Sequence, residues 1–285
     1  RGLGDVYKRQ PVTETSAQPA QPKRRQVVVT VVYGTHAERL DYTFSSFAQN
    51  PHLELHAFVL GDRLPRNQVP GIRYHLRAPD PAFSHPMRDA DYRRWVFLDE
   101  LEADYALVVD GLDVLCLRAL PPLSDLLRGA CFAGCVEHRG GRHLGGGVYT
   151  SNFLNAGVTF WDVRASVALR HEVERRGRTR FRNLVDDQLA LNEVIHARFF
   201  DHITILPCHY NYRGSLGPRP WGWPRTPHLD GVRIYHNRHW LEAARRLAPT
   251  PDHAALSPLT PDFGPLSPWR QRWRRWLTRW RGEGY

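Results

Sequence analysis

The stretch that most constrains the fold of this chain is residues 105–118, with the sequence YALVVDGLDVLCLR. An apolar, β-branched run leads to Asp110, and a second apolar run follows Asp113. Such a run is typical of a strand that is buried on both faces of an α/β sheet. An ionised carboxylate beside an apolar sheet must be paired, hydrogen-bonded or bound to a metal.

The position of these two carboxylates suggests a ligand site. In open α/β sheets, ligands bind at the carboxyl ends of the strands. We therefore expect Asp110 and Asp113 to hold a divalent cation that in turn binds a diphosphate. The alternative is a turn in which Asp and Gly serve only the backbone geometry.

The remaining pattern alternates between strands and helices and predicts an α/β fold. A buried strand at residues 27–33, VVVTVVY, ends at Gly34, and a helix is expected to follow through residue 48. This order is the usual start of a nucleotide-binding α/β domain. Further strands are expected at residues 53–60, 71–77, 130–136, 153–163, 203–206 and 232–235, and helices at residues 91–103, 121–128 and 186–196.

The chain divides into one domain with terminal extensions. Its 285 residues suffice for one sizeable core. Residues 1–10, RGLGDVYKRQ, read as the translated transposon adapter of a sequencing library, so we expect them to be an artefact and the natural N-terminus to be missing. Residues 11–26 predict a disordered lead-in. The predicted domain covers residues 27–248, followed by a Pro-rich linker at 249–266 and a basic, Trp-rich amphipathic helix at 267–285.

The charge distribution argues against nucleic acid as a partner. The net charge is +10, but residues 1–25 carry +4 and residues 268–285 carry +5, which leaves +1 for the domain. Phosphate backbones require clustered positive charge. The four cysteines lie in apolar surroundings without metal-type spacing, so we expect buried free thiols and a reducing compartment. No apolar run approaches the roughly 20 residues that span a bilayer.

Several short motifs occur in an order that resembles the GT-A-fold glycosyltransferases, most closely the glycogenin and bacterial lipopolysaccharide glycosyltransferase family. They are a strand ending in Tyr-Gly-Thr, an Arg-bearing helix, ALVVDGLDVL, NFLNAGVTFWDV, DDQLALN, ILPCHYNY and IYHNRHW, and they span residues 27–240. The resemblance implies a Rossmann-like nucleotide-sugar-binding fold with a mixed, mostly parallel central sheet flanked by helices.

The same resemblance implies the roles of site residues. Asp110, Asp113 and His236 would bind Mn²⁺ (or Mg²⁺), which holds the diphosphate of a UDP-sugar. Two carboxylates and one imidazole suit Mn²⁺, which accepts nitrogen more readily than Mg²⁺ does. Arg93 or Arg94 would contact a phosphate.

Other matching positions would surround the rest of the donor. The resemblance places Val32, Tyr33, Gly34 and Thr35 at the uracil and ribose. It places Asn155, Asp187 and Gln188 around the transferred sugar, where Asp187 or Gln188 would steady the oxocarbenium-like centre of a retaining transfer. Helix capping by Asp186 and Asp187 is the structural alternative.

Two motifs depart from the family pattern. The acidic motif is Asp-Gly-Leu-Asp, one residue longer than Asp-x-Asp, a variant that resembles some collagen-modifying glycosyltransferases. The closing His-x-x-Gly-x-x-Lys-Pro-Trp is shortened to a run from His236 to Trp240, which lacks the phosphate-binding Lys. Arg238 or His239 would take its place.

The function expected from the sequence is transfer of a sugar to a saccharide or lipid-linked envelope acceptor, in the cytoplasm or peripherally at the inner face of the membrane. Three alternatives remain. A nucleotidyltransferase would show a Gly-rich start that ends in Arg-Leu and is followed by Pro-Lys. Residues 34–40, GTHAERL, mimic the first half of this motif, but no Pro-Lys follows nearby. The others are a non-enzymatic Arg-rich module that binds membrane or nucleic acid, and a glycosyltransferase fold without activity.

The tail at residues 267–282 predicts an interfacial helix. Trp269, Trp273, Trp276 and Trp280 recur at steps of four, three and four residues, and Arg residues fill the remainder. One aromatic stripe with basic flanks is typical of a helix that lies on anionic lipid. The alternative is that the stripe packs on the domain.

A truncation tests the role of the tail. A chain that ends at Asp262 should no longer float with vesicles of anionic phospholipid, whereas the chain through Tyr285 should float, because the Trp stripe and the Arg charges are then present. Liposome flotation measures this, with neutral vesicles as the control. Equal flotation of both chains on anionic vesicles would exclude the tail as a membrane contact.

Overall fold

The computed structural model describes residues 24–83, 85–137, 142–145, 148–150, 152–179, 186–213 and 232–236. The expected segments at residues 1–10, 249–266 and 267–285 lie outside the described residues, as does the expected lead-in at 11–26 apart from residues 24–26.

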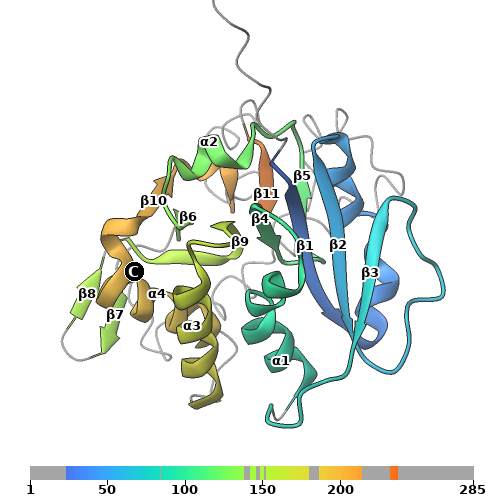
Figure 1. Cartoon of the computed structure of the whole chain (residues 1–285), viewed down its shortest axis with the longest axis horizontal. Helices are drawn as coiled ribbons and strands as arrows, with labels where there is room; N and C mark the ends of the chain where they lie inside the picture. Colours follow the sequence, from blue (N-terminus) through green and yellow to red (C-terminus); the bar gives the residue numbers. More distant parts are fainter. Residues whose placement is uncertain are drawn as a thin grey trace, which may run out of the picture.

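A seven-stranded sheet forms the centre of the described part (Figure 1). Its strand order is β10-β6-β9-β4-β1-β2-β3. The strands are β1 (Gln26–Tyr33), β2 (Leu53–Leu60), β3 (Ile72–Arg77), β4 (Tyr105–Val109), β6 (Phe132–Val136), β9 (Leu154–Asp162) and β10 (Ile203–Leu206). Strand β9 is antiparallel to both of its neighbours, β4 and β6, and the other neighbouring pairs are parallel. The expected mixed, mostly parallel sheet is confirmed.

The connections of β1 create a switch point in the sheet. The chain runs from β1 outward to β2 and β3, and then returns to the other side of β1 as β4. Two neighbouring strands whose connections leave in opposite directions open a crevice at their carboxyl ends. These ends are Tyr33 in β1 and Val109 in β4.

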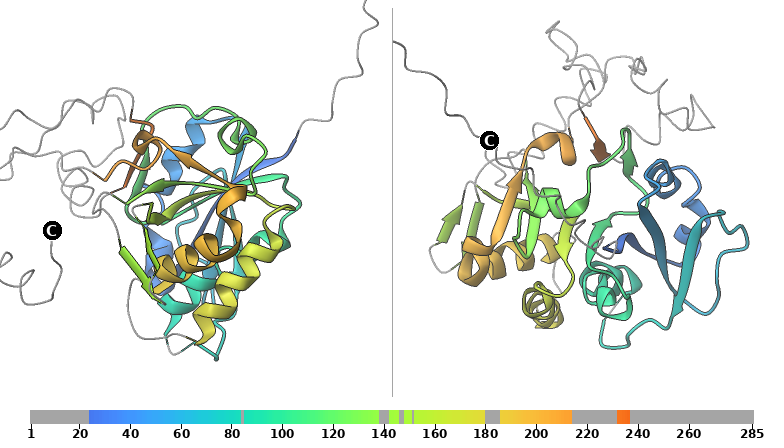
Figure 2. Two further views of the ribbon diagram at one scale, coloured as in Figure 1. Left: turned by 90° about the vertical axis from the view of Figure 1, so that its left-hand side faces the viewer. Right: turned by 45° about the horizontal axis from the view of Figure 1, so that its top comes forward.

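Helices cover both faces of the sheet, as the alternating side chains of β1 require. Val28 and Val32 belong to one apolar cluster, and Val27 and Val29 belong to the other. The first cluster packs against η1 (Gly34–Arg39), η2 (Phe44–Gln49) and α2 (Leu123–Leu127), and the second against α1 (Pro86–Arg93), η3 (Val96–Glu100), α3 (Val167–Thr179) and α4 (Asp186–Val194). Figures 1 and 2 show α2 on one side of the sheet and α1, α3 and α4 on the other.

A smaller antiparallel sheet joins two distant parts of the chain. Strand β5 (Val114–Cys116) follows the acidic loop and pairs with β11 (Ile234–His236). The sequence places a strand at 232–235 with His236 just past it, whereas His236 is the last residue of β11. A second pair consists of β7 (Arg142–Gly145) and β8 (Val148–Thr150). After α4 come the short turns η4 (Ile195–Phe199), η5 (Phe200–His202) and η6 (Cys208–Tyr210).

The helix expected at residues 34–48 is wrong, because two short 3-10 helices, η1 and η2, occupy this segment. Its polar side chains bond to the acidic loop and to β5. Thr43 Oγ1 donates to the carbonyl oxygen of Gly111, and Ser46 Oγ accepts from the backbone N–H of Cys116 at 2.9 Å. Hydroxyl groups that bond to backbone elsewhere compete with a regular helix. The segment therefore holds the acidic loop and β5 in place through these hydrogen bonds.

The helix expected at residues 91–103 begins earlier than predicted. The side chain of His85 caps α1 by accepting a backbone N–H, and Pro86 suits the first turn. Arg93 and Arg94 therefore end α1, whereas the sequence places them at the start of a helix. The 3-10 turn η3 follows within the predicted range.

Helix α3 has no counterpart among the expected elements, because its sequence VALRHEVERRGRT offers few apolar positions. Its anchor is Arg170, which is fully buried. The Arg170 guanidinium donates to the carbonyl oxygens of Trp95 and Val163, each at 2.8 Å, and pairs with Asp99 at 2.7 Å. Arg170 Nε also donates to Ser166 Oγ at 3.0 Å, so four acceptors satisfy the buried charge, and the bond to Trp95 fixes the backbone next to Arg94.

The cysteines follow the expectation with one exception. Cys116, Cys131 and Cys135 are buried free thiols, whereas Cys208 is exposed, so the expected burial is wrong for Cys208. Within the described residues, no helix has both the length and the apolar character to cross a bilayer.

Candidate active site

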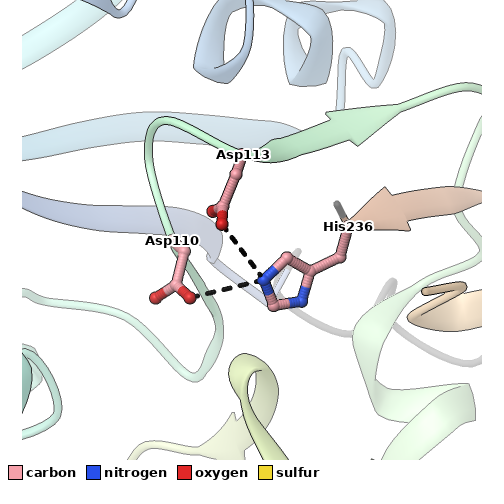
Figure 3. Close-up of side chains that lie close together, drawn as sticks. All are labelled: Asp110, Asp113 and His236. Atoms are coloured by element: carbon pink, nitrogen blue, oxygen red, sulfur yellow. Dashed lines mark ion pairs between the residues drawn. The ribbon is translucent and has the colours of Figure 1, made fainter. Parts of the chain in front are cut away.

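The fold brings Asp110, Asp113 and His236 together (Figure 3). Asp110 follows β4, Asp113 precedes β5, and the pairing of His236 with Val114 places the imidazole beside this loop. His236 Nε2 lies 3.5 Å from Asp110 Oδ2 and 3.6 Å from Asp113 Oδ2. The three candidate ligand atoms lie within 4.8 Å of one another.

Two glycines make this close approach possible. A methyl group on Gly157 would overlap His236 Cε1 and Asp110 Oδ2. A Cβ on Gly111 would lie 2.5 Å from Thr30 Oγ1, so the loop between the two aspartates can lie on β1 only with glycine at this position. Both positions require glycine for space rather than for an unusual φ angle.

The ligand set fits a divalent cation. Asp110 and Asp113 offer carboxylate oxygens, and His236 offers Nε2, since its Nδ1 lies 3.0 Å from the amide oxygen Oδ1 of Asn211. An amide oxygen only accepts, so Nδ1 carries a hydrogen, and Nε2 is the nitrogen that can bind a metal once its own proton has left. Although burial lowers the pKa of His236, the carboxylates of Asp113 and Asp110 raise it to about 9.

Arg94 lies between two carboxylates and is only 5% exposed. Its guanidinium donates to Asp110 Oδ1 and, at 2.5 Å, to Asp187 Oδ2. Burial raises the pKa of Asp110, but Arg94 and His236 outweigh it and hold that pKa far below its usual range. Burial also raises the pKa of Asp187, and here it prevails over Arg94. The two carboxyl groups differ because His236 hydrogen-bonds to Asp110, whereas repulsion by Asp110 adds to burial in raising the pKa of Asp187.

A further carboxylate, Asp91 of α1, lines the same cleft. Burial and repulsion by Asp187 raise the pKa of Asp91 to about 8. Carboxyl groups thus crowd this end of the cleft, and a bound divalent cation would favour their ionised forms.

The cleft opens at the carboxyl ends of β1 and β4, at the switch point of the sheet. Of the residues expected at the base and ribose, Val32 and Tyr33 line it. Gly34 adopts a φ of +52°, and Thr35 next to it is exposed.

His36 and Arg39 also line the cleft, although the sequence analysis assigns them no role. Both lie in η1, a segment for which the sequence predicts a regular helix. The rings of Tyr33 and His36 lie with their centroids 4.6 Å apart.

Of the arginines expected to contact a phosphate, only Arg94 lines the cleft within the described residues. Arg94 lines the cleft, whereas Arg93 pairs with Asp89 at 3.0 Å, and its guanidinium lies 4.6 Å from the ring centre of Phe97. Arg238 lies outside the described residues.

Asn155 and Gln188 belong to a network of side chains that reaches His236 through Asn211. Asn155 is 2% exposed, and its Nδ2 donates to Glu137 Oε2 at 2.9 Å and to Gln188 Oε1 at 3.0 Å. Gln188 Nε2 also donates to Glu137 Oε2, at 3.2 Å. Arg213 pairs with the same oxygen at 2.9 Å. Although burial raises the pKa of Glu137, Arg213 and the two amides hold it below its usual range.

Glu137, Arg213 and Asn211 are site residues that the sequence analysis missed. Asn211 lies inside the quoted motif ILPCHYNY, so its position in that motif is the signal that could have identified it. Glu137 follows a buried strand, as Asp110 does, but carries no second acidic residue nearby.

Comparison with solved structures shows which fold this is. The galactosyltransferase LgtC, in complex with donor and acceptor sugar analogues, matches with a TM-score of 0.56 and 17% identity over 86% of this chain and 99% of LgtC. An active-site mutant of LgtC, in which a glutamine is changed to glutamate, matches with a TM-score of 0.50 and 17% identity over 74% of this chain and 86% of that chain.

The bifunctional glycosyltransferase WbbM, in its apo structure, matches with a TM-score of 0.55 and 14% identity over 84% of this chain and 52% of WbbM. No protein-family model and no curated protein matches the chain. The chain has the GT-A fold, and the structures that it resembles are glycosyltransferases.

The raised pKa of His236 predicts how cation binding depends on pH. Below a pKa of about 9 a proton competes with the cation for Nε2. The affinity for Mn²⁺ should therefore rise by up to about tenfold per unit between about pH 6 and about pH 8.5. Titration of Mn²⁺ followed by electron paramagnetic resonance measures this. In the control His236→Ala the dependence should be much flatter, and a flat profile in the wild type would contradict the role of Nε2.

A methyl group at Gly157 should damage the same site. Gly157→Ala should weaken Mn²⁺ binding by at least about tenfold, because the new Cβ displaces the ligands Asp110 and His236. The matched control is Gly61→Ala, since a Cβ at Gly61 has no atom within 4 Å. Unchanged Mn²⁺ affinity in a folded Gly157→Ala protein would show that the cation binds elsewhere.

Proposed function

We propose that this chain is a metal-dependent glycosyltransferase that moves a sugar from a nucleotide-diphosphate donor, a UDP-sugar, to a saccharide or lipid-linked acceptor. The observation that carries the proposal is the meeting of Asp110, Asp113 and His236 beside a cleft at the switch point of a GT-A fold. Fold alone does not define a function, whereas a site with hard oxygen ligands in a nucleotide-type crevice favours diphosphate chemistry.

The metal would be Mn²⁺ (or Mg²⁺), held by Asp110, Asp113 and His236. When bound, it would act as a Lewis acid that stabilises the negative charge of the departing diphosphate. The protein's own part is to keep Asp110 ionised and to direct Nε2 of His236 at the cation. Arg94 does the first for Asp110 and Asn211 does the second for His236.

The donor would extend from the metal along the cleft. Val32 and Tyr33 line the cleft, so they and their neighbours Gly34 and Thr35 would contact the base and ribose. Arg94 is the better placed candidate for a phosphate contact, because it lines the cleft, whereas Arg93 lies against Phe97. Arg238 remains a further candidate for the missing Lys.

The transferred sugar would lie near Asp187 and Gln188. Asp187 is buried and held by Arg94, and a carboxylate there would steady positive charge on the sugar in a retaining transfer. A glutamine belongs to the active site of LgtC, which supports a role for Gln188. Asn155 is buried behind these groups and would position Gln188.

The acceptor would be a saccharide of the cell envelope, as in lipopolysaccharide biosynthesis. LgtC has been captured with donor and acceptor sugar analogues, which favours a saccharide here as well. We further propose that the enzyme works in the cytoplasm and that residues 267–285 bring it to the inner face of the membrane.

Titration of UDP tests the donor site directly. UDP should bind with measurable heat when Mn²⁺ is present. Without Mn²⁺, or in Asp113→Ala, the affinity for UDP should fall by more than about 100-fold, because the cation would hold the diphosphate. Isothermal titration calorimetry measures this, with the exposed Asp125→Ala as the matched control. An affinity for UDP that is the same with and without Mn²⁺, and the same in Asp113→Ala, would contradict the proposal.

A further inference from the structure

A chain of side-chain amides runs from His236 into the protein. His236 Nδ1 lies 3.0 Å from Asn211 Oδ1, and Asn211 Nδ2 donates to Asn155 Oδ1 at 2.8 Å. Asn155 Nδ2 in turn donates to Glu137 Oε2 at 2.9 Å. Asn211 and Asn155 are each 2% exposed, so their amides exchange no partners with bulk water.

Glu137 and the backbone of Gly157 fix the orientation of the Asn155 amide. The carboxylate of Glu137, which pairs with Arg213, can only accept, so it must face the amide nitrogen of Asn155. The backbone N–H of Gly157 can only donate, and it reaches Asn155 Oδ1 at 2.9 Å. Both partners require the same orientation, with the amide oxygen turned toward Asn211.

The orientation of Asn211 follows from that of Asn155. The oxygen of Asn155 can meet only the nitrogen of Asn211, because two facing amide oxygens would repel each other. Asn211 Oδ1 is thereby turned to His236. A reversed Asn211 would donate to Nδ1, place the imidazole hydrogen on Nε2 and remove the lone pair that a cation needs.

We propose that Asn211 is the positioning residue that holds His236 in the Nδ1–H tautomer and aims Nε2 at the cation, and that Asn155 and Glu137 lock Asn211 in this orientation. The proposal rests on the proposed function, because it assumes that a cation binds at Asp110, Asp113 and His236. Asn211 meets His236 at Nδ1, so it would act on the cation through His236.

A pair of substitutions at one position separates this role from simple packing. Asn211→Leu and Asn211→Asp both remove the donor to Asn155, but only Asn211→Asp keeps an acceptor for Nδ1–H. We expect Asn211→Leu to weaken Mn²⁺ binding by about 10- to 100-fold and Asn211→Asp to recover most of that loss. If Asn211 only packs, Asn211→Asp should be at least as damaging, since it buries a charge.

The measurement is a Mn²⁺ titration with the full chain, followed by electron paramagnetic resonance with UDP present. Electron spin echo modulation of the bound Mn²⁺ then reports whether an imidazole nitrogen is a ligand. The nitrogen signal should be present in the wild type, lost in Asn211→Leu and restored in Asn211→Asp. A gain in affinity without the nitrogen signal would reflect added negative charge alone and would overturn the proposal.

A measurement on the wild type does not depend on how the variants fold. With ¹⁵N-labelled histidine and ¹¹³Cd²⁺ in place of Mn²⁺, nuclear magnetic resonance should show coupling from Cd²⁺ to Nε2 of His236 and a protected proton on Nδ1. Coupling to Nδ1, or no histidine coupling at all, would overturn the proposal.

The outcomes also separate this inference from the proposed function. If Mn²⁺ affinity falls in Asp113→Ala but is unchanged in Asn211→Leu, the inference about Asn211 is wrong and the proposed metal site stands. A wild type that binds neither Mn²⁺ nor UDP would remove both.

Discussion

The concentration of carboxylates at the carboxyl end of β4 is the constraint on which the rest of the site depends. Asp110, Asp113 and Asp187 are held close together, partly out of water, and like charges at such distances raise one another's energy unless cations are interposed. Arg94 supplies one fixed positive charge, and removing such a partner from a buried group typically costs about 3–5 kcal/mol. A divalent ion between Asp110 and Asp113 would add further positive charge, and this arrangement of carboxylates supports the proposed cation.

Steric room is the second condition, and it explains why glycines stand where they do. Gly157 lies on β9, opposite the end of β4, and its carbonyl oxygen accepts from the backbone N–H of Asp110 at 2.9 Å. The ladder between β4 and β9 therefore presses residue 157 against the side chains that would hold the cation. Gly111 meets the same requirement on the side of β1. The charge cluster exists only because the surrounding backbone leaves it this space.

The sequence reveals the parts of this site that local patterns encode. The apolar runs around Asp110 and Asp113 predict the strands and the paired carboxylates, and the α/β fold with its mixed sheet is confirmed. The predicted helix at 34–48 is wrong, and the helix predicted at 91–103 begins earlier, because hydroxyl bonds from Thr43 and the cap at His85 outweigh apolar spacing. The roles of Gly157 and Glu137 depend on strand register and on contacts between distant segments, which no local pattern contains. Asn211 lies in a recognisable motif, but its contact with His236 joins two distant segments.

The three candidate ligands differ in how firmly the chain holds them, and this difference locates the sensitive point of the site. Asp110 and Asp113 flank one short loop, so their separation follows from local backbone geometry. His236 arrives from far along the chain, and its placement depends on the short ladder between β5 and β11 and on Asn211. Because a cation needs all its ligands at once, the least constrained ligand limits its affinity. Substitutions at residues that contact His236, such as Asn211, would therefore tune the proposed metal binding without changing any of the three candidate ligands.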